Sequence, residues 1–243
     1  FYEMLCRRLD AIVYPTCFTR DEALRIAPWI GTKAQIVRNG FSGQFRDETD
    51  RVEQRRAARD RLGLPQDAFV VGNAGWLIKR KRFDVFLRAA AEIRKTLPNA
   101  LFTICGGGPL ENELHALAND LGIAPAVRFE GWLTDLADHY RSWDVLLFNS
   151  DFDALGNVPM EGASHGCPIV ASLGYGGLGE FIEHGRNGYL FSQHDIVALA
   201  TAVVALAREP FRAAAIRAEA RRTLETRFSP QGTAHFYRDF FSR

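Results

Sequence analysis

Between residues 69 and 171 the chain alternates short apolar runs of strand length with longer segments whose apolar residues keep helical spacing. We predict strands at 69–73, 101–105, 127–130, 145–148 and 169–171. The helix after the first strand is indicated by apolar positions from Phe83 to Leu97 and stops before Pro98. Repeated strand–helix units favour an α/β fold, with a Rossmann-like parallel sheet and helices on both faces.

The segments on either side of this region have their own patterns. Residues 1–40 predict a helix at 1–9, a strand at 11–14, a helix at 19–27 and a strand at 35–38. A polar stretch at 41–49 suits a linker, and a charged helix at 50–62 ends at Gly63. Three helices are predicted within 196–207, 211–225 and 230–241. Because the chain opens on Phe1 inside a predicted helix, we expect it to be a fragment of a longer protein.

Composition excludes several functional classes. The net charge is +1 and the only dense basic cluster is Lys79 to Arg82, so we expect no nucleic-acid partner. The four cysteines are scattered without a CxxC pair, which favours a reducing compartment. No apolar run reaches the roughly 18 residues that a membrane helix needs. The histidines lack the spacing of metal ligands, so no metal is expected.

A turn with two carboxylates follows the strand predicted at 145–148. Asp153 and Glu161 bracket a glycine-containing stretch that leads into a helix. In parallel sheets ligands bind at the carboxyl ends of the strands, and the start of a helix favours anions such as a diphosphate. The two carboxylates would then bind hydroxyl groups, which predicts a sugar-nucleotide site. In the simpler alternative, Asp153 caps the helix and Glu161 interacts with its dipole.

Asp151 and Asp153 also form a DxD sequence, a pattern that holds a divalent metal on a diphosphate in some enzymes. Pairs of carboxylates at this spacing are common on protein surfaces. We therefore do not expect a metal here.

Five segments, taken in order, resemble the group 1 glycosyltransferases (family 4, GT-B fold). They are 69–84, 104–118, 127–133, 153–161 and 176–190. The resemblance implies a retaining enzyme of two Rossmann-like domains, of which this chain holds the carboxyl-terminal, donor-binding half. The implied domains are a remnant of the amino-terminal acceptor domain at 1–40, a linker and helix at 41–66, the donor-binding domain at 67–226 and a crossing helix at 227–243.

The resemblance also implies three catalytic residues. Glu161 would bind the ribose hydroxyls, Asp153 the hydroxyls of the transferred sugar, and Lys81 the diphosphate. Two positions depart from the family: Asp153 stands where glutamate is usual, and Trp76 where an arginine is usual. The neighbouring cations Lys79, Arg80 and Arg82 are candidates to replace that charge.

Eight further residues are implied to bind the donor through main-chain groups, charge or stacking: Gly75, Arg80, Gly131, Trp132, Leu133, Leu155, Gly156 and Asn157. Two of these regions have structural alternatives. Glycines 106–108 favour a turn over a ligand contact, and Trp132 beside a strand end is more often part of a core than a platform for a nucleobase.

The resemblance implies sugar transfer from a nucleotide-diphosphate sugar to a saccharide or lipid-linked acceptor, without a cofactor or essential metal. Polysaccharide biosynthesis in the cytoplasm is the expected setting, with peripheral association at the cytoplasmic face of the membrane through the absent domain. Without that domain, the chain alone is expected to be inactive. The exposed strand edge within 11–38 could pair two copies into a homodimer. Alternatives are a non-catalytic nucleotide-sugar-binding module, a sugar-nucleotide epimerase, or a phosphorylase, although no lysine for pyridoxal phosphate stands out.

Overall fold

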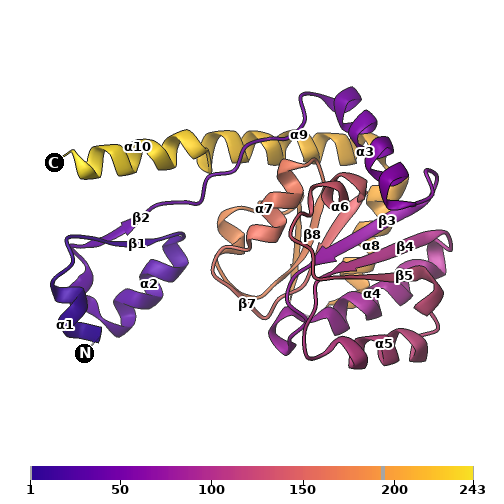
Figure 1. Ribbon diagram of the computed structural model, residues 1–243, viewed down its shortest axis with the longest axis horizontal. Coiled ribbons are helices and arrows are strands. Elements are labelled where there is room, and N and C mark those ends of the chain that lie inside the picture. The colour runs from indigo at the N-terminus through magenta and orange to yellow at the C-terminus, as the bar shows by residue number, and fades with distance from the viewer. Residues whose placement is uncertain (1, 193–194, 243) are drawn as a thin grey trace.

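The computed structural model describes residues 2–192 and 195–242, which form a small unit and a large unit joined by an extended segment (Figure 1). The small unit contains α1 (Tyr2–Arg7), β1 (Ile12–Tyr14), α2 (Cys17–Ile26) and β2 (Ala34–Ile36). Its two strands pair in parallel. Helix α2 starts two residues earlier than predicted because the Thr16 side chain caps it by accepting a hydrogen bond from the Thr19 N–H.

The large unit, residues 48–227, is an α/β domain. Its main elements are α3 (Glu48–Leu62), β3 (Phe69–Ala74), α4 (Phe83–Thr96), β4 (Ala100–Cys105), α5 (Glu111–Asp120), β5 (Val127–Gly131), α6 (Ala137–Ser142), β6 (Val145–Phe148), α7 (Asn157–Ser164), β8 (Ile169–Leu173), β10 (Tyr189–Ser192), α8 (Ile196–Arg208) and α9 (Pro210–Arg227). Two short strands, β7 (Phe152–Asp153) and β9 (Tyr175–Gly176), pair separately. The chain ends with α10 (Pro230–Phe241).

All neighbouring strands of the six-stranded sheet are parallel, in the order β10-β8-β6-β3-β4-β5. The predicted parallel sheet is thus confirmed. Strand β10, which has four residues, was not predicted.

Helices cover both faces of this sheet, as expected (Figure 1). On one face, α4, α5 and α8 pack on the sheet through a cluster that includes Phe86, Phe102 and Val203. On the other, α7 and the end of α9 pack on β6 around Trp143 and Met160. Adjacent residues of a strand thereby enter different clusters, as the pleat requires.

The segment between the units is packed rather than loose. The predicted linker at 41–49 buries Phe45, and its Gln44 N–H donates to the Ser164 carbonyl at 2.7 Å. Helix α3 begins at Glu48, earlier than predicted, because Asp47 caps it by accepting from the Asp50 N–H at 3.0 Å. The linker therefore follows the surface of the large unit.

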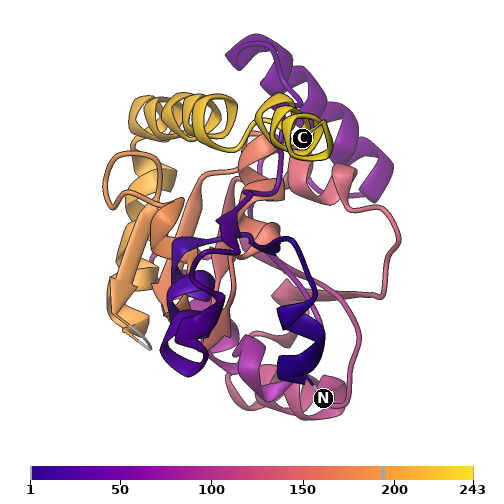
Figure 2. The ribbon, with the colours of Figure 1, turned by 90° about the vertical axis from the view of Figure 1, so that its left-hand side faces the viewer.

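The small unit meets the large one through polar contacts and through the edge-to-face packing of Phe18 on Tyr175. The Phe18 N–H donates to Glu180 Oε1 at 2.8 Å, and Arg38 lies 3.5 Å from the same carboxylate. The Thr16 hydroxyl donates to the Ala154 carbonyl at 3.2 Å. Helix α10 runs beside the small unit (Figures 1 and 2), and its apolar face borders β1.

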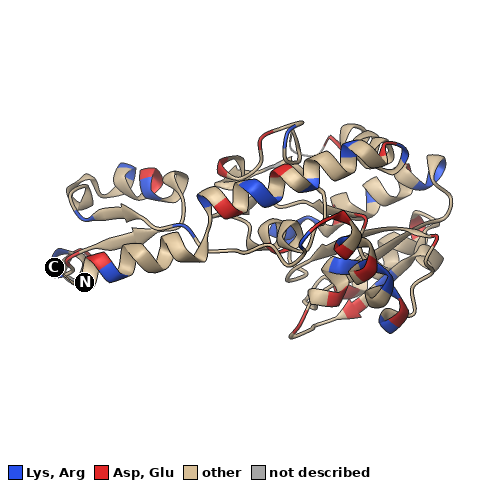
Figure 3. Cartoon of the chain, turned by 90° about the horizontal axis from the view of Figure 1, so that it is seen from above, with Lys and Arg blue, Asp and Glu red and all other residues tan. Residues whose placement is uncertain are grey.

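Charges of both signs are mixed over both units (Figure 3). On α9, for example, Glu219 pairs with Arg222 of the same helix and with Arg186 of a preceding loop. Within the described ranges, no helix combines the length and the apolar character that crossing a bilayer requires.

Candidate functional site

The strand order creates a crevice between β3 and β6. From β3 the chain adds β4 and β5 on one side, then crosses back to place β6, β8 and β10 on the other. Ligands of open α/β sheets bind at this point, outside the carboxyl ends of the strands. The loops that follow β3 and β6 meet there, and these loops contain the basic cluster and the carboxylate turn.

Lys81 and Asp153 bridge this crevice. Lys81 ends the short 3-10 turn η2 (Lys79–Lys81), and its Nζ lies 2.5 Å from Asp153 Oδ2. Both side chains are largely buried, and Lys81 Nζ lies 5.6 Å from the centre of the Phe148 ring. The structure therefore brings together the residues expected to bind diphosphate and sugar. The ammonium and the carboxylate form an ion pair.

A cavity of 310 Å³ lies beside this pair. Its lining residues come from the loop after β3, the end of β6, the turn into α7 and the small unit: Pro15, Asn39, Lys81, Phe148, Asp153, Ala154, Leu155, Gly156, Asn157 and Val158. The small unit thus contributes to the wall of the cavity.

The start of α7 faces this cavity. Gly156 precedes the helix with φ of 79°, a left-handed conformation that favours glycine, and Asn157 is the first helical residue. Because Gly156 has no side chain, it cannot cap the N–H groups of Asn157 and Val158 at the start of α7, and such groups suit an anion. Leu155, which also lines the cavity, is buried in the core. The Asn157 side chain accepts a hydrogen bond from Asn39 at 3.0 Å.

Glu161 lies one turn farther along α7 and does not line this cavity. It follows Asn157 by four residues, about 6 Å along the helix axis. Its Oε2 accepts a hydrogen bond from the Tyr140 hydroxyl of α6 at 2.7 Å. Burial, together with the neighbouring Glu161 carboxylate, raises the pKa of Tyr140, so the phenol stays a donor. The sequence carried no signal for Tyr140, because its partner is on another helix.

The glycine-rich turn after β4 packs closely against the loop after β3. A Cβ atom on Gly106 would lie 1.9 Å from the carbonyl oxygen of Gly75, so no side chain fits there. The Gly106 N–H also donates to the Gly131 carbonyl at 2.7 Å. These contacts support the structural interpretation of glycines 106–108, which hold three loops together.

Two tryptophans beside this turn are exposed. Trp132 is 72% exposed and Trp76 is 55% exposed, which excludes the structural alternative that Trp132 belongs to a core. The chain turns at Gly131, where φ is 70°, and Trp132 no longer continues the alternation of β5. Leu133, next in sequence, packs against the core instead.

Arg80 and Arg82 contact the segment after β6. Arg80 donates from Nη1 to the Phe152 carbonyl at 2.7 Å, and Arg82 pairs with Asp151 at 3.1 Å. The two aspartates of the DxD sequence therefore pair with different cations, Asp151 with Arg82 and Asp153 with Lys81. Among the residues that the structure describes, no group of three or more His, Cys, Asp and Glu side chains is arranged to hold a metal ion.

Comparison with known proteins gives a consistent family. The sequence profile described as "Glycosyl transferases group 1" matches residues 66–209. The lipopolysaccharide core biosynthesis glycosyltransferase LpsD of Rhizobium meliloti (strain 1021) is 34% identical over 186 residues, covering 76% of this chain and 53% of that protein. D-inositol 3-phosphate glycosyltransferase 2 of Catenulispora acidiphila is 39% identical over 175 residues, covering 68% of this chain and 41% of that protein. The chain spans about half the length of these curated relatives.

Solved structures show the same fold. Anabaena HepE in complex with UDP and glucose superimposes with a TM-score of 0.86 at 21% identity, covering 99% of this chain and 65% of that one. Staphylococcus aureus TarM in complex with UDP gives a TM-score of 0.82 at 18% identity, covering 98% and 45%. The expected fold, a Rossmann-like half of the GT-B arrangement, is thereby confirmed.

Proposed function

Because this chain belongs to the group 1 glycosyl transferases, we propose that it is the donor-binding part of an enzyme that transfers a sugar from a nucleotide-diphosphate sugar to a saccharide or lipid-linked acceptor. The observation that carries the proposal is the Lys81–Asp153 pair, 2.5 Å apart, across the crevice of the parallel sheet. At that position the cation can bind the diphosphate of such a donor, and the carboxylate can bind the hydroxyl groups of its sugar.

Donor binding would break the ion pair between Lys81 and Asp153 and give each side chain a new partner. The diphosphate takes the Lys81 ammonium, and Asp153 turns to the hydroxyls of the sugar. The free N–H groups at the start of α7 bind phosphate oxygen. Glu161, oriented by Tyr140, binds the ribose hydroxyls, and Gly131, Trp132 and Leu133 lie near the base. Asp153 is shorter than the family's usual glutamate, and its position beside Lys81 keeps it within reach of the crevice.

We further propose that transfer retains the anomeric configuration and needs no metal. The bond between the anomeric carbon and the diphosphate oxygen breaks as the acceptor hydroxyl bonds to that carbon on the same face. The hydroxyl proton passes to the leaving diphosphate. Lys81 and the helix start stabilise the developing negative charge, which is electrostatic rather than covalent catalysis.

The wider setting is also a proposal. The acceptor is a saccharide or a lipid-linked saccharide, as the name of the lipopolysaccharide core relative suggests. All four cysteines are free thiols, which supports a reducing, cytoplasmic location. The proposal also includes peripheral contact of the longer protein with the membrane, which binding to lipid vesicles tests. It includes a homodimer as well, which analytical sedimentation tests.

Calorimetry with UDP, GDP and ADP tests the donor site. We expect the chain to bind at least one of them, and Lys81→Ala to weaken that binding by about 10- to 100-fold, the value of a charge-assisted contact. Glu161→Gln is expected to weaken it less, since the amide still accepts one hydrogen bond. Lys95→Ala, on the exposed end of α4, is the matched control and should change nothing. Unchanged binding in both site variants would refute the site.

Sugar transfer by the longer protein tests the activity. NMR of the product's anomeric proton distinguishes retention from inversion. Binding without transfer would favour the non-catalytic module, whereas conversion of the nucleotide sugar without an acceptor would favour the epimerase.

A further inference from the structure

Arg82 has an unusual backbone conformation, with φ of 51° and ψ of 44°. No other non-glycine residue within the described ranges has a positive φ. This region strains an L-residue with a side chain. The Arg82 N–H donates to the Lys79 carbonyl at 3.1 Å, and its own carbonyl accepts from the Val85 N–H at 3.0 Å. Its conformation therefore sets the angle between η2, which ends at Lys81, and α4.

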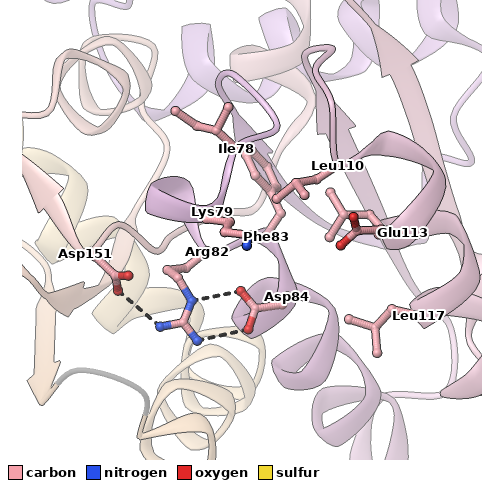
Figure 4. Close-up of a pocket in the computed structure, with 10 residues that line it drawn as sticks. Ile78, Lys79, Arg82, Phe83, Asp84, Leu110, Glu113, Leu117 and Asp151 are labelled. Atoms are coloured by element: carbon pink, nitrogen blue, oxygen red, sulfur yellow. Dashed lines mark hydrogen bonds and ion pairs between the residues drawn. The ribbon is translucent and has the colours of Figure 1, made fainter.

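The guanidinium of Arg82 is held from two sides (Figure 4). Its Nε and Nη2 donate to the two oxygens of Asp84, each at 2.9 Å, and its Nη1 donates to Asp151 at 3.1 Å. Asp84 is in the first turn of α4, whereas Asp151 follows β6. A strained residue persists when its surroundings determine its conformation in this way, and such residues cluster at functional sites.

The contact with Asp151 is one of three consecutive links across the crevice. Arg80 contacts Phe152 at 2.7 Å, Lys81 contacts Asp153 at 2.5 Å, and Arg82 contacts Asp151. The Asp151 N–H also donates to the Arg80 carbonyl at 2.8 Å. Residues 80–82 are thus joined to residues 151–153. Lys81, which we propose binds the diphosphate, is the middle residue of the first segment.

Stabilisation of α4 does not explain this arginine. A cation at the start of a helix is opposed by the helix dipole, and Asp84 already supplies the favourable negative charge there. Glycine would also adopt the turn without strain. The retained strain and the link to a second loop call for another role.

We propose that Arg82 is a positioning residue: its left-handed backbone and its bonds to Asp84 and Asp151 hold Lys81 opposite Asp153, in the orientation that binds the donor diphosphate. This inference rests on the proposed function. Arg82, Asp84 and Asp151 also line a cavity of 370 Å³ (Figure 4). The side chains of Asp84 and Asp151 are each 40% exposed, so water reaches these links.

Arg82→Gly tests the inference, because glycine accepts this φ and the fold should be kept. The probe is whichever of UDP, GDP and ADP the unchanged chain binds most tightly. We expect the dissociation constant to rise about fivefold, the value of one partly exposed ion pair. The lysine of Arg82→Lys can reach one of the two carboxylates, so its dissociation constant should lie between those of the unchanged chain and Arg82→Gly. Arg88→Ala removes an exposed cation from α4 and should have no effect.

A double-mutant cycle with Lys81→Ala separates positioning from charge. If Arg82 acts through Lys81, Arg82→Gly has no further effect in a chain that already carries Lys81→Ala. An arginine that attracts the phosphate through space would weaken binding by the same factor in both backgrounds, which would overturn the inference. Asp151→Asn, which leaves the Arg82 backbone unchanged, should reproduce the loss when Lys81 is present and should have no effect when it is combined with Lys81→Ala.

The outcomes distinguish this inference from the function on which it rests. If the unchanged chain binds none of the three nucleotides, the proposed function fails and the inference fails with it. If it binds one of them and Arg82→Gly and Asp151→Asn bind equally well, the inference alone is overturned.

Discussion

The large unit and the small unit are stabilised by different forces. The large unit contains two apolar clusters on opposite faces of its sheet, with Phe86 and Trp143 fully buried. In the small unit, by contrast, helix α2 buries none of its residues, and Glu180 of the large unit supplies the central contact. The comparison teaches that the large unit has its own apolar core, whereas the small unit is positioned by contacts with neighbouring segments, among them the bond to Glu180 and the packing of Phe18 on Tyr175.

The large unit also contains a buried ion pair. Arg59 of α3 is fully buried and donates to Asp144 at 2.6 Å, to the Ser142 carbonyl at 2.9 Å and to the Ala68 carbonyl at 2.7 Å. Burial lowers the pKa of Arg59, and Asp144 opposes this by favouring the charged form. This pair joins α3 to the strands β3 and β6.

The largest change in the free energy of unfolding is expected when the ion pair between Arg59 and Asp144 is broken. Asp144→Ala leaves the Arg59 charge buried without its carboxylate, and we expect a loss of about 3–5 kcal/mol in the free energy of unfolding. Urea denaturation followed by circular dichroism measures it. Asp120→Ala, which removes an exposed carboxylate at the end of α5, is the control. A loss no larger than that of the control would show that the apolar clusters alone hold the large unit.

A smaller effect is expected where the two units meet. Glu180→Ala removes the acceptor of the Phe18 N–H and the partner of Arg38, and should lower the opening free energy of the small unit by about 1.5–3 kcal/mol. Hydrogen exchange of the α2 amides measures this opening. Glu183→Ala, which removes an exposed carboxylate of the same loop, is the control. If exchange in the sheet accelerates equally, the two units open together and the comparison is wrong.

Mild acid should lower the stability of the large unit through two of its histidines. Burial lowers the pKa of both His139 and His165 below the ordinary value of 6.5. The unfolded chain therefore binds more protons than the folded one near that pH. This contribution to stability is complete above pH 6.5 and is lost as the pH falls through the folded-state pKa values.

Melting temperatures between about pH 7.5 and about pH 5.5 test this direction. The double variant His139→Gln and His165→Gln should flatten the dependence. Residues 1–40 contain no histidine, so the small unit has no such contribution. A melting temperature that rises on acidification would contradict the prediction.

The smallest effect is expected at the end of α10. Phe241 is 79% exposed, so Phe241→Ser should change the free energy of unfolding by less than about 0.5 kcal/mol. Phe228→Ser, at a position buried where α9 ends, is the contrasting variant and should be far more costly. A large loss at Phe241 would mean that α10 stabilises the protein more than its burial implies.

Local patterns predicted much of the fold and part of the site. The alternation of strands and helices predicted the parallel sheet, and the position of Asp153 after a strand predicted a ligand site at the sheet's carboxyl edge. The ion pair of Asp153 with Lys81 was not predicted, because 72 residues separate them. The exposure of Trp132 and the hydrogen bond from Tyr140 to Glu161 depend in the same way on how distant segments meet.

The sequence by itself determined the period of the apolar residues, and hence which segments become strands or helices and where the turns between them lie. Those features are local, because each depends on residues within one or two turns of one another. Only the tertiary structure decided which loops meet at the crevice between β3 and β6, that Arg82 takes a strained conformation between two carboxylates, and that Arg59 is buried. Those features depend on the strand order, which brings together residues that share no local pattern.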